Sequence, residues 1–329
     1  MEAGGPRECL VVVAPCFDEE EGLAHFVEAV SKALDETGID YRIVLVDDGS
    51  ADGTPKIMRE LATQYPRVRP VFLSRNFGQQ IAISAGLDAA KGADAVVVMD
   101  ADMQHTPEAL LALIEEWRRG GEVIMAVRRD VASVSLFKGF TSKLFYRVFN
   151  VFSDTKIQPG ASDFFLLSAN AHRAFLQLPE RSRLVRGLLH WIGFDRRYVE
   201  YDMPPRLAGE SKYSTMRMVG LALDGLISFS SRPIHVATRL GVVTAFAGMV
   251  YLAYVFGRAL FVGDLAVGWG SIMATLLVLG GLQLTFIGLV GEYIARIYQE
   301  AKSRPLYVLR CEPDALGFEK PESNAKDSE

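Results

Sequence analysis

Several features that would assign this chain to a common class of protein are missing from its sequence. The three cysteines form no C-x-x-C pair, and their odd number closes no disulfide framework, so a reducing compartment is the simplest expectation. The formal net charge of −5 argues against a nucleic-acid-binding protein, which would present a basic face. Residues 1–8 lack the basic and apolar regions of a signal peptide, so the first domain is expected to stay in the cytoplasm.

Two glycine-rich motifs that hold phosphates are also absent. No G-x-G-x-x-G follows the first predicted strand, which argues against a dinucleotide cofactor. No G-x-x-x-x-G-K-[ST] is present, which argues against a P-loop. A nucleotide bound by this chain would therefore have its phosphates held by a metal ion and by basic side chains.

The first half of the chain alternates between strand and helix periodicity. Apolar runs predict strands at 10–14, 42–46, 68–73, 95–99 and 122–127, and amphipathic patterns predict helices at 20–36, 54–64, 79–90 and 107–119. Strands separated by helices indicate βαβ units and a largely parallel sheet, so we expect an α/β, Rossmann-like domain. In such sheets ligands bind beyond the carboxyl ends of the strands.

Acidic residues follow two of these predicted strands. Asp100-Ala-Asp102-Met-Gln104 comes directly after the run 95–99, and Asp47-Asp48-Gly-Ser follows the run 42–46. Mg²⁺ and Mn²⁺ favour oxygen ligands of this kind, often one or two carboxylates completed by substrate phosphates. An acidic turn that caps the helix near Thr106 is the better interpretation of the first motif alone. Two acidic strand ends together favour one shared site.

The C-terminal third contains two long uncharged segments. The 18 residues from Leu240 to Gly257 and the 27 from Leu265 to Gly291 carry no Asp, Glu, Lys or Arg. A bilayer core needs about 20 apolar residues, so both segments are predicted to span it, with buried core helices as the weaker alternative. Basic residues before the first segment and after the second place both ends in the cytoplasm.

Two further segments, 134–152 and 216–229, combine aromatic or apolar residues with basic ones. This pattern suits helices that lie in the lipid headgroup plane. An ordinary surface helix explains the first segment about equally well.

The predicted organisation is a catalytic domain at 1–213, a juxtamembrane helix at 214–234, a transmembrane hairpin at 235–298 with spans at 237–261 and 267–291, and a tail at 299–329. The end of that tail is expected to be disordered.

Several motifs in order resemble family 2 glycosyltransferases, over about residues 8 to 310. The shared segments are Val12–Glu21, Asp47–Ser50, Ser74–Gly78 and Asp100–Gln104. Val185–Leu188, Trp191–Phe194, Arg206–Tyr213, Gly291–Tyr298 and Arg304–Tyr307 narrow the resemblance to the polyprenyl-phosphate branch, in its bacterial form with a two-span anchor. That branch includes the bactoprenol glucosyltransferases and dolichol-phosphate mannose synthase.

The resemblance implies a GT-A fold and an inverting transfer of a sugar from a nucleoside diphosphate sugar, expected to be a UDP-sugar, to undecaprenyl phosphate. It implies an enzyme in the bacterial inner membrane that needs Mg²⁺ or Mn²⁺. The predicted interfacial helices and anchor leave room for a homo-oligomer in the membrane. Asp102 and Gln104 are the expected metal ligands, with Asp100 near the metal and the ribose. The other expected donor-site residues are Pro15, Asp18, Asp47, Asp48 and Gln79. For Asp18, a helix cap is nearly as good an interpretation.

Basic residues near the predicted membrane are expected to hold phosphates. Arg206, Ser211 and Lys212 are predicted to clamp the diphosphate and close the site, although any one of them alone could be solvated surface charge. Arg128, Lys138 and Ser142 correspond to the residues of the family that hold the acceptor phosphate. Unselective headgroup binding is the alternative for Lys138.

Asp163 is the expected catalytic carboxylate beneath the donor sugar. A phosphate monoester with a second pKa of about 6 is already largely dianionic at neutral pH, so a base is hardly needed. We therefore rank an orienting role above proton abstraction. His105 stands where the family commonly has Asp, and it is interpreted as a turn residue rather than a metal ligand.

Two other functions remain open at this point. A processive polysaccharide synthase would need more spans and a Q-x-x-R-W segment, and Arg186 to Trp191 does not match that motif. A non-catalytic membrane adaptor that only binds a nucleotide sugar would also explain a cleft and a hairpin. The joint presence of Asp100, Asp102, Gln104, Arg206 and Lys212 argues against the adaptor.

Overall fold

The computed structural model describes residues 8–129, 161–181, 183–202, 232–261 and 268–310. The described residues fall into two compact units. The first contains 8–129, the described part of 161–202, and 305–310, and the second contains 232–261 and 268–304. The predicted helices at 134–152 and 216–229 lie outside the described residues.

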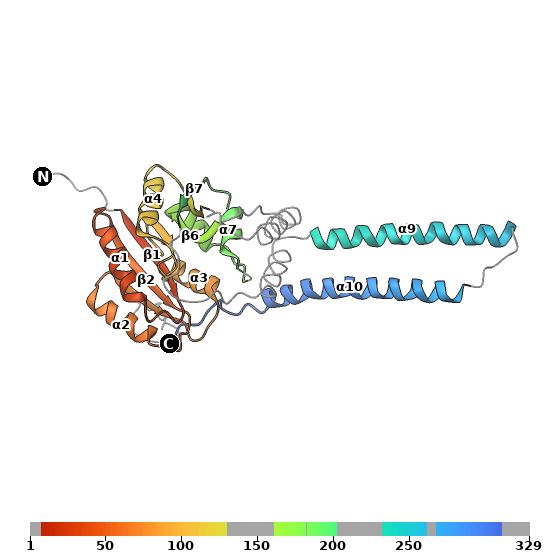
Figure 1. The fold of residues 1–329 in the computed structure, drawn as a ribbon, viewed down its shortest axis with the longest axis horizontal. Helices are drawn as coiled ribbons and strands as arrows, with labels where there is room; N and C mark the ends of the chain where they lie inside the picture. Colours follow the sequence, from red (N-terminus) through yellow and green to blue (C-terminus); the bar gives the residue numbers. More distant parts are fainter. Residues whose placement is uncertain (1–7, 130–160, 182, 203–231, 262–267, 311–329) are drawn as a thin grey trace, which may run out of the picture. The chain divides into compact units, whose positions relative to one another are not determined.

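In the first unit, helices pack against a sheet (Figure 1). The sheet has seven strands in the order β3-β2-β1-β4-β6-β5-β7. Neighbouring strands are parallel, except that β6 runs antiparallel to both β4 and β5. The strands are β1 (Cys9–Cys16), β2 (Asp40–Asp47), β3 (Val68–Phe72), β4 (Ala95–Val98), β5 (Val123–Arg128), β6 (Ala161–Ser168) and β7 (Arg196–Tyr201). This is a GT-A-like α/β Rossmann fold with a mostly parallel sheet.

Helices follow most strands, as the alternating periodicity predicted. They are α1 (Leu23–Asp35), α2 (Thr54–Gln64), α3 (Gln79–Ala89), α4 (Pro107–Arg118), α6 (Ala169–Leu176) and α7 (Val185–Trp191). The five strands and four helices predicted in the first half are confirmed, with shifts of a few residues at their ends. The largest shift is at α1, which begins at Leu23 rather than at residue 20.

The two faces of the sheet are buried by different helices. Alternate residues of β1, such as Leu10 and Val12, belong to one apolar core with residues of α1, α2 and α4. On α3, Gly86 packs so closely that a Cβ there would lie 2.1 Å from Cγ1 of Val13 and 3.1 Å from Cγ2 of Val46. Side chains alternate along a strand, so Val13 faces away from Leu10 and Val12, and α3 covers the second face.

The last described residues of the chain return to the first unit. Leu309 forms an antiparallel bridge with Leu73, and the N–H of Ser74 donates to the carbonyl of Val308 at 2.8 Å. The Tyr307 hydroxyl donates to Asp88 Oδ2 at 3.0 Å. These contacts cover the open edge of β3, which would otherwise present unpaired backbone groups.

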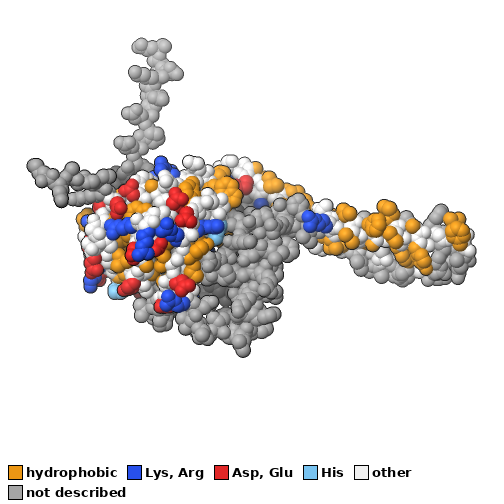
Figure 2. Space-filling model, turned by 90° about the horizontal axis from the view of Figure 1, so that it is seen from above, with side chains coloured by type: hydrophobic (Ala, Val, Ile, Leu, Met, Phe, Trp, Pro, Cys, Tyr) orange, Lys and Arg blue, Asp and Glu red, His pale blue; other side chains and the backbone are white. Residues whose placement is uncertain are grey.

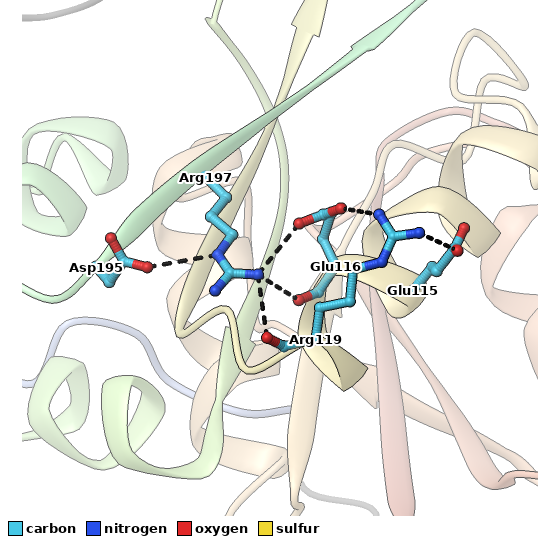
Figure 3. Close-up of polar contacts among 5 residues, drawn as sticks. All are labelled: Glu115, Glu116, Arg119, Asp195 and Arg197. Atoms are coloured by element: carbon cyan, nitrogen blue, oxygen red, sulfur yellow. Dashed lines mark hydrogen bonds and ion pairs between the residues drawn. The ribbon is translucent and has the colours of Figure 1, made fainter.

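An ion-pair cluster fastens the end of α4 to β7, the opposite edge strand (Figure 3). Arg119 pairs with Glu115 at 2.5 Å and with Glu116 at 2.6 Å, and Arg197 reaches Glu116 at 3.2 Å. Arg197 also lies 3.4 Å from Asp195. Hydrogen bonds from the two arginines lower the pKa of the Glu116 carboxyl, and the contribution of Arg119 is the larger. Because the cluster is exposed, we assign it a small stabilising effect.

The second unit is a hairpin of two long helices, α9 (Arg232–Phe261) and α10 (Trp269–Ala301). Figure 2 shows hydrophobic side chains along these helices, and those exposed include Val242, Val243, Phe246, Leu284 and Ile287. Within the parts of the chain that the structure describes, none of the helices combines the length and the apolarity needed to cross a membrane.

Candidate functional site

Four predicted site residues lie at one edge of the sheet. Asp47 ends β2, Asp100 follows β4, and Arg128 ends β5. Because β6 is antiparallel to its neighbours, its first residues lie at this same edge, and they include Asp163. Carboxyl ends of parallel strands meet at one edge, which is where α/β sheets bind their ligands.

Asp100 has an unusual electrostatic environment. Burial raises the pKa of its carboxyl to about 7, and the nearby charges of Asp163 and Asp102 add to the effect. The side-chain amide of Gln79, at the start of α3, donates to Asp100 Oδ1 at 2.9 Å and works in the opposite direction. The negative charges of Asp163 and Asp102 repel that of Asp100, so a cation bound beside Asp100 would be stabilised.

The turn after Asp100 has a defined internal structure. Asp102 Oδ1 accepts from the N–H of Gln104 at 3.0 Å, and Met103 between them has a φ of 61°. Gln104 is buried, with 8% of its surface exposed. The cap of α4 is Thr106, whose hydroxyl oxygen accepts from the N–H of Ala109 at 3.3 Å. The acidic residues are therefore not the helix cap that the alternative interpretation would make them.

His105 holds this turn from the inside. Its ring is 2% exposed and stacks on Phe164 of β6, with 4.5 Å between the ring centroids. Burial lowers the pKa of His105 to about 4, so its ring is neutral at pH 7. The N–H of Asp100 donates to its Nδ1 at 2.9 Å, so the proton of the neutral ring is on Nε2. The prediction of a turn residue is consistent with these contacts.

The donor chemistry of this turn fits a divalent ion of the Mg²⁺ or Mn²⁺ type. Asp102 offers a carboxylate whose Oδ1 accepts a backbone N–H, and Asp100 adds a second carboxylate near it. Among the residues that the structure describes, no group of three or more His, Cys, Asp or Glu is arranged to hold a metal. An ion held by these residues would complete its shell with substrate oxygens, as Mg²⁺ commonly does.

The second acidic turn holds a neighbouring loop in place. Asp48 Oδ1 accepts from the N–H of Phe77 at 2.7 Å, and its Oδ2 accepts from the N–H of Gly78 at 2.9 Å. Burial raises the pKa of the Asp48 carboxyl, and these two hydrogen bonds oppose the shift. Gly49 has a φ of +73°, and a Cβ there would lie 2.5 Å from the carbonyl carbon of Arg75. Only glycine lets these two loops approach so closely.

Two other predicted donor-site residues lie beside this turn. Asp18 has a φ of 53°, and its Oδ1 accepts from the N–H of Ala51 at 3.0 Å. Its own N–H donates to Ser50 Oγ at 3.0 Å. The residue at the N-cap of α1 is Gly22, so Asp18 links two loops and does not cap that helix. Pro15 pairs with Val46 across β1 and β2.

Asp163 is fixed from two sides by Gln80 and Arg186, neither of which was predicted to contact it. Gln80 Nε2 donates to Asp163 Oδ2 at 2.9 Å, and Arg186 Nε lies 2.9 Å from Asp163 Oδ1. The sequence signal for Gln80 was a pair of glutamines at the start of a helix that follows a strand end. Arg186 lies in the Val185–Leu188 motif that resembles the family, but nothing in that motif indicates a contact with Asp163, which is 23 positions away in the chain.

The structure describes only one of the remaining predicted site residues. Arg128 is exposed at the end of β5. Arg206, Ser211, Lys212, Lys138 and Ser142 lie outside the described residues. Their roles stay predictions.

Comparison with protein families gives two matches. Residues 11–175 match the family described as glycosyl transferase family 2. Residues 232–297 match the family described as the GtrB C-terminal hairpin, a range that lies within the span of α9 and α10.

Individual relatives are similar over almost the whole chain. The bactoprenol glucosyl transferase of Shigella phage SfV is 38% identical over 92% of this chain and 98% of its own length. The prophage bactoprenol glucosyl transferase homolog of Escherichia coli K12 is 36% identical over 91% of this chain and 97% of its own. The uncharacterized glycosyltransferase sll0501 of Synechocystis is 38% identical over 91% of this chain and 94% of its own length.

Proposed function

The chain belongs to glycosyl transferase family 2, and we propose that this glycosyltransferase moves a sugar from a nucleoside diphosphate sugar to undecaprenyl phosphate. The observation that carries the proposal is the position of Asp100, Asp102 and Asp163 near one another at the carboxyl edge of the sheet. Two glutamines at the start of α3 donate hydrogen bonds to Asp100 and Asp163. The relatives named bactoprenol glucosyl transferase support sugar transfer to a polyprenyl phosphate.

In the proposed reaction, an oxygen of the lipid phosphate attacks the anomeric carbon of the sugar. The bond between that carbon and the diphosphate oxygen breaks, and its electron pair leaves with the nucleoside diphosphate. Attack from the face opposite the leaving group inverts the anomeric centre. Because the attacking phosphate is already largely dianionic at pH 7, Asp163 orients the reactants and need not remove a proton.

We propose that a divalent ion, Mg²⁺ or Mn²⁺, is held by Asp102 and Gln104, with Asp100 beside it. Such an ion would stabilise the charge that grows on the leaving diphosphate. Asp102 is the stronger of the two ligand candidates, because its carboxylate carries a negative charge, whereas the amide of Gln104 is neutral and its residue is buried.

The donor, expected to be a UDP-sugar, would lie along the same edge of the sheet. Its nucleoside would contact the loops that carry Pro15, Asp18, Asp47 and Asp48, and Gln79 would lie close to it. Since both oxygens of Asp48 already accept backbone N–H groups, we expect Asp48 to shape the pocket rather than to bind the base. Arg206, Ser211 and Lys212 would clamp the diphosphate, and Arg128, Lys138 and Ser142 would hold the acceptor phosphate.

We further propose that the α9–α10 hairpin anchors the protein in the bacterial inner membrane, with the catalytic domain and both termini in the cytoplasm. The match of residues 232–297 to the GtrB C-terminal hairpin supports this, as do the exposed apolar side chains of both helices. A lipid acceptor with a polyprenyl chain would then be presented to the enzyme at the membrane surface.

A panel of radiolabelled donors tests the function. The purified full-length protein is mixed with undecaprenyl phosphate and each of several UDP- and GDP-sugars, with Mn²⁺ or with EDTA. We expect one donor to label the lipid in Mn²⁺ and not in EDTA. Metal-dependent nucleotide binding with no transfer from any donor would instead favour the adaptor function.

A further inference from the structure

Gln80, the second residue of α3, uses both ends of its side-chain amide. Its Nε2 donates to Asp163 Oδ2 at 2.9 Å, and its Oε1 accepts from the backbone N–H of Val185 at 2.8 Å. Val185 is the first residue of α7, a helix whose N-cap residue provides no side-chain cap. One side chain thus connects three elements and satisfies one of the N–H groups that a helix start leaves without a partner in the helix.

Asp163 receives its second partner from α7 itself. Arg186, the second residue of that helix, has its Nε 2.9 Å from Asp163 Oδ1. The Asp163 side chain is 9% exposed. Each oxygen of this nearly buried carboxylate is therefore fixed by a different helix, and Gln80 is in contact with both the carboxylate and the helix that carries the arginine.

The neighbouring glutamine makes the same kind of contact with the other side of the site. Gln79 Nε2 donates to Asp100 Oδ1 at 2.9 Å. Consecutive residues at the start of α3 thereby hold the carboxylate that follows β4 and the carboxylate on β6. The close packing at Gly86 against Val13 fixes α3 on the sheet, so this helix sets the positions of both carboxylates.

From these contacts we propose that Gln80 is a positioning residue for sugar transfer, which acts by fixing Asp163 and by docking α7. The inference rests on the proposed function. A carboxylate that orients a substrate must stay within a fraction of an ångström of its productive place, and a shift of about 1 Å can lower a rate by about 100-fold. Gln80 itself does not need to touch the substrate.

Two substitutions separate the functions of the amide. Gln80→Glu keeps an oxygen that can accept from Val185 but replaces the donor to Asp163 with a second carboxylate oxygen. Gln80→Leu removes both hydrogen bonds. Gln64→Leu, the same change at an exposed position at the end of α2, is the matched control.

The variants are compared by the kcat and KM of transfer from the donor that the wild type uses. We expect both Gln80 variants to lose about 10- to 100-fold in kcat, with a KM for the donor within about threefold of the wild-type value. Gln64→Leu should match the wild type. If Gln80→Leu does not fold, Gln80→Glu decides. A kcat per folded Gln80→Glu molecule equal to that of the wild type would overturn the proposal.

A double-mutant cycle with Asp163→Asn asks whether Gln80 acts through Asp163. We expect Gln80→Leu combined with Asp163→Asn to have about the same kcat as Asp163→Asn alone, because the group to be positioned is already lost. Losses that multiply would overturn the proposal. Absence of transfer by the wild type from every donor would overturn the proposed function and this inference with it. Transfer that the Gln80 variants keep in full would overturn this inference alone.

Discussion

Asp102 is the residue on which the proposed metal chemistry depends most. Asp102→Asn removes the negative charge and keeps the shape and the oxygen that accepts from Gln104. We expect this variant to lose about 100- to 1,000-fold in kcat at fixed Mn²⁺, because an electrostatic contact to the leaving group is weakened. Steady-state transfer rates over a range of Mn²⁺ concentrations provide the measurement.

The matched control for Asp102→Asn is Asp40→Asn, at the exposed amino end of β2 and hence at the opposite edge of the sheet. It should leave the rate unchanged. Turnover by Asp102→Asn at the wild-type level would rule out Asp102 as a metal ligand.

His105 gives a prediction for stability against pH. Its pKa is lowered to about 4 by burial, while the unfolded chain binds a proton near 6.5. Between these values the unfolded state holds a proton that the native state lacks, and this proton favours unfolding. Above pH 6.5 neither state is protonated, so His105 then makes its largest contribution to the free energy of unfolding. This contribution is lost progressively as the pH falls toward 4.

His105→Asn retains an acceptor for the N–H of Asp100 but loses the titration and the stacking on Phe164. We expect the variant to be less stable than the wild type at pH 8, and the difference to shrink as the pH falls from 6.5 to about 4. Urea unfolding of both proteins in metal-free buffer at several pH values measures this. A difference independent of pH would contradict the assignment of a neutral native His105.

At the scale of elements, α3 is the helix that organises the site. Its close approach to the sheet depends on Gly86, where a Cβ would lie 2.1 Å from Val13 Cγ1. We expect Gly86→Ala to lower the free energy of unfolding by about 1–3 kcal/mol through overpacking, and to slow transfer because Gln79 and Gln80 shift with the helix. Chemical unfolding and the transfer rate test the two effects.

Gly280→Ala on α10 is the control for this substitution, since Gly280 is also a glycine within a helix and a Cβ there would meet nothing within 4 Å. Val13→Ala in the Gly86→Ala background removes the methyl group that clashes and should restore part of both losses. A Gly86→Ala protein with wild-type stability would show that the helix can move away from the sheet without penalty.

The elements of the first half were predictable because each was a local pattern. Buried strands such as Ala95–Val98 are uninterrupted apolar runs, and helices such as Thr54–Gln64 carry one apolar face. The contacts of Asp163 were not predictable in the same way. Gln80, Asp163 and Arg186 are far apart in the sequence, and they meet because β6 runs antiparallel to its neighbours and returns to the carboxyl edge.

The end of the chain shows a similar limit. The sequence predicted a tail after the hairpin but no contacts for it, and in the structure Leu309 pairs with Leu73 and Tyr307 with Asp88. A single short extended segment carries little periodic signal, and its partner strand is more than 200 positions away. Burial raises the pKa of the Tyr307 hydroxyl most, and the charge of Asp88 and the hydrogen bond to Asp88 raise it further. The hydroxyl therefore stays protonated and can donate.

At the scale of the whole molecule, the hairpin is proposed to determine where the enzyme works. We expect the full-length protein to sediment with membranes, to resist extraction by sodium carbonate at high pH, and to be released by detergent. The apolar side chains exposed on α9 and α10 are the physical reason, since lipid would cover them. Release of the intact protein by carbonate alone would contradict the anchor.

The phosphate of the lipid is the proposed acceptor of the sugar, and a comparison of two lipids tests this role. Purified protein with Mn²⁺ and its preferred radiolabelled nucleotide sugar is offered undecaprenyl phosphate or undecaprenol, which differ only in the phosphate. We expect labelled lipid with undecaprenyl phosphate, with one phosphate between sugar and lipid by mass spectrometry, and no labelled lipid with undecaprenol. Equal labelling of both lipids, or labelling of neither, would contradict it.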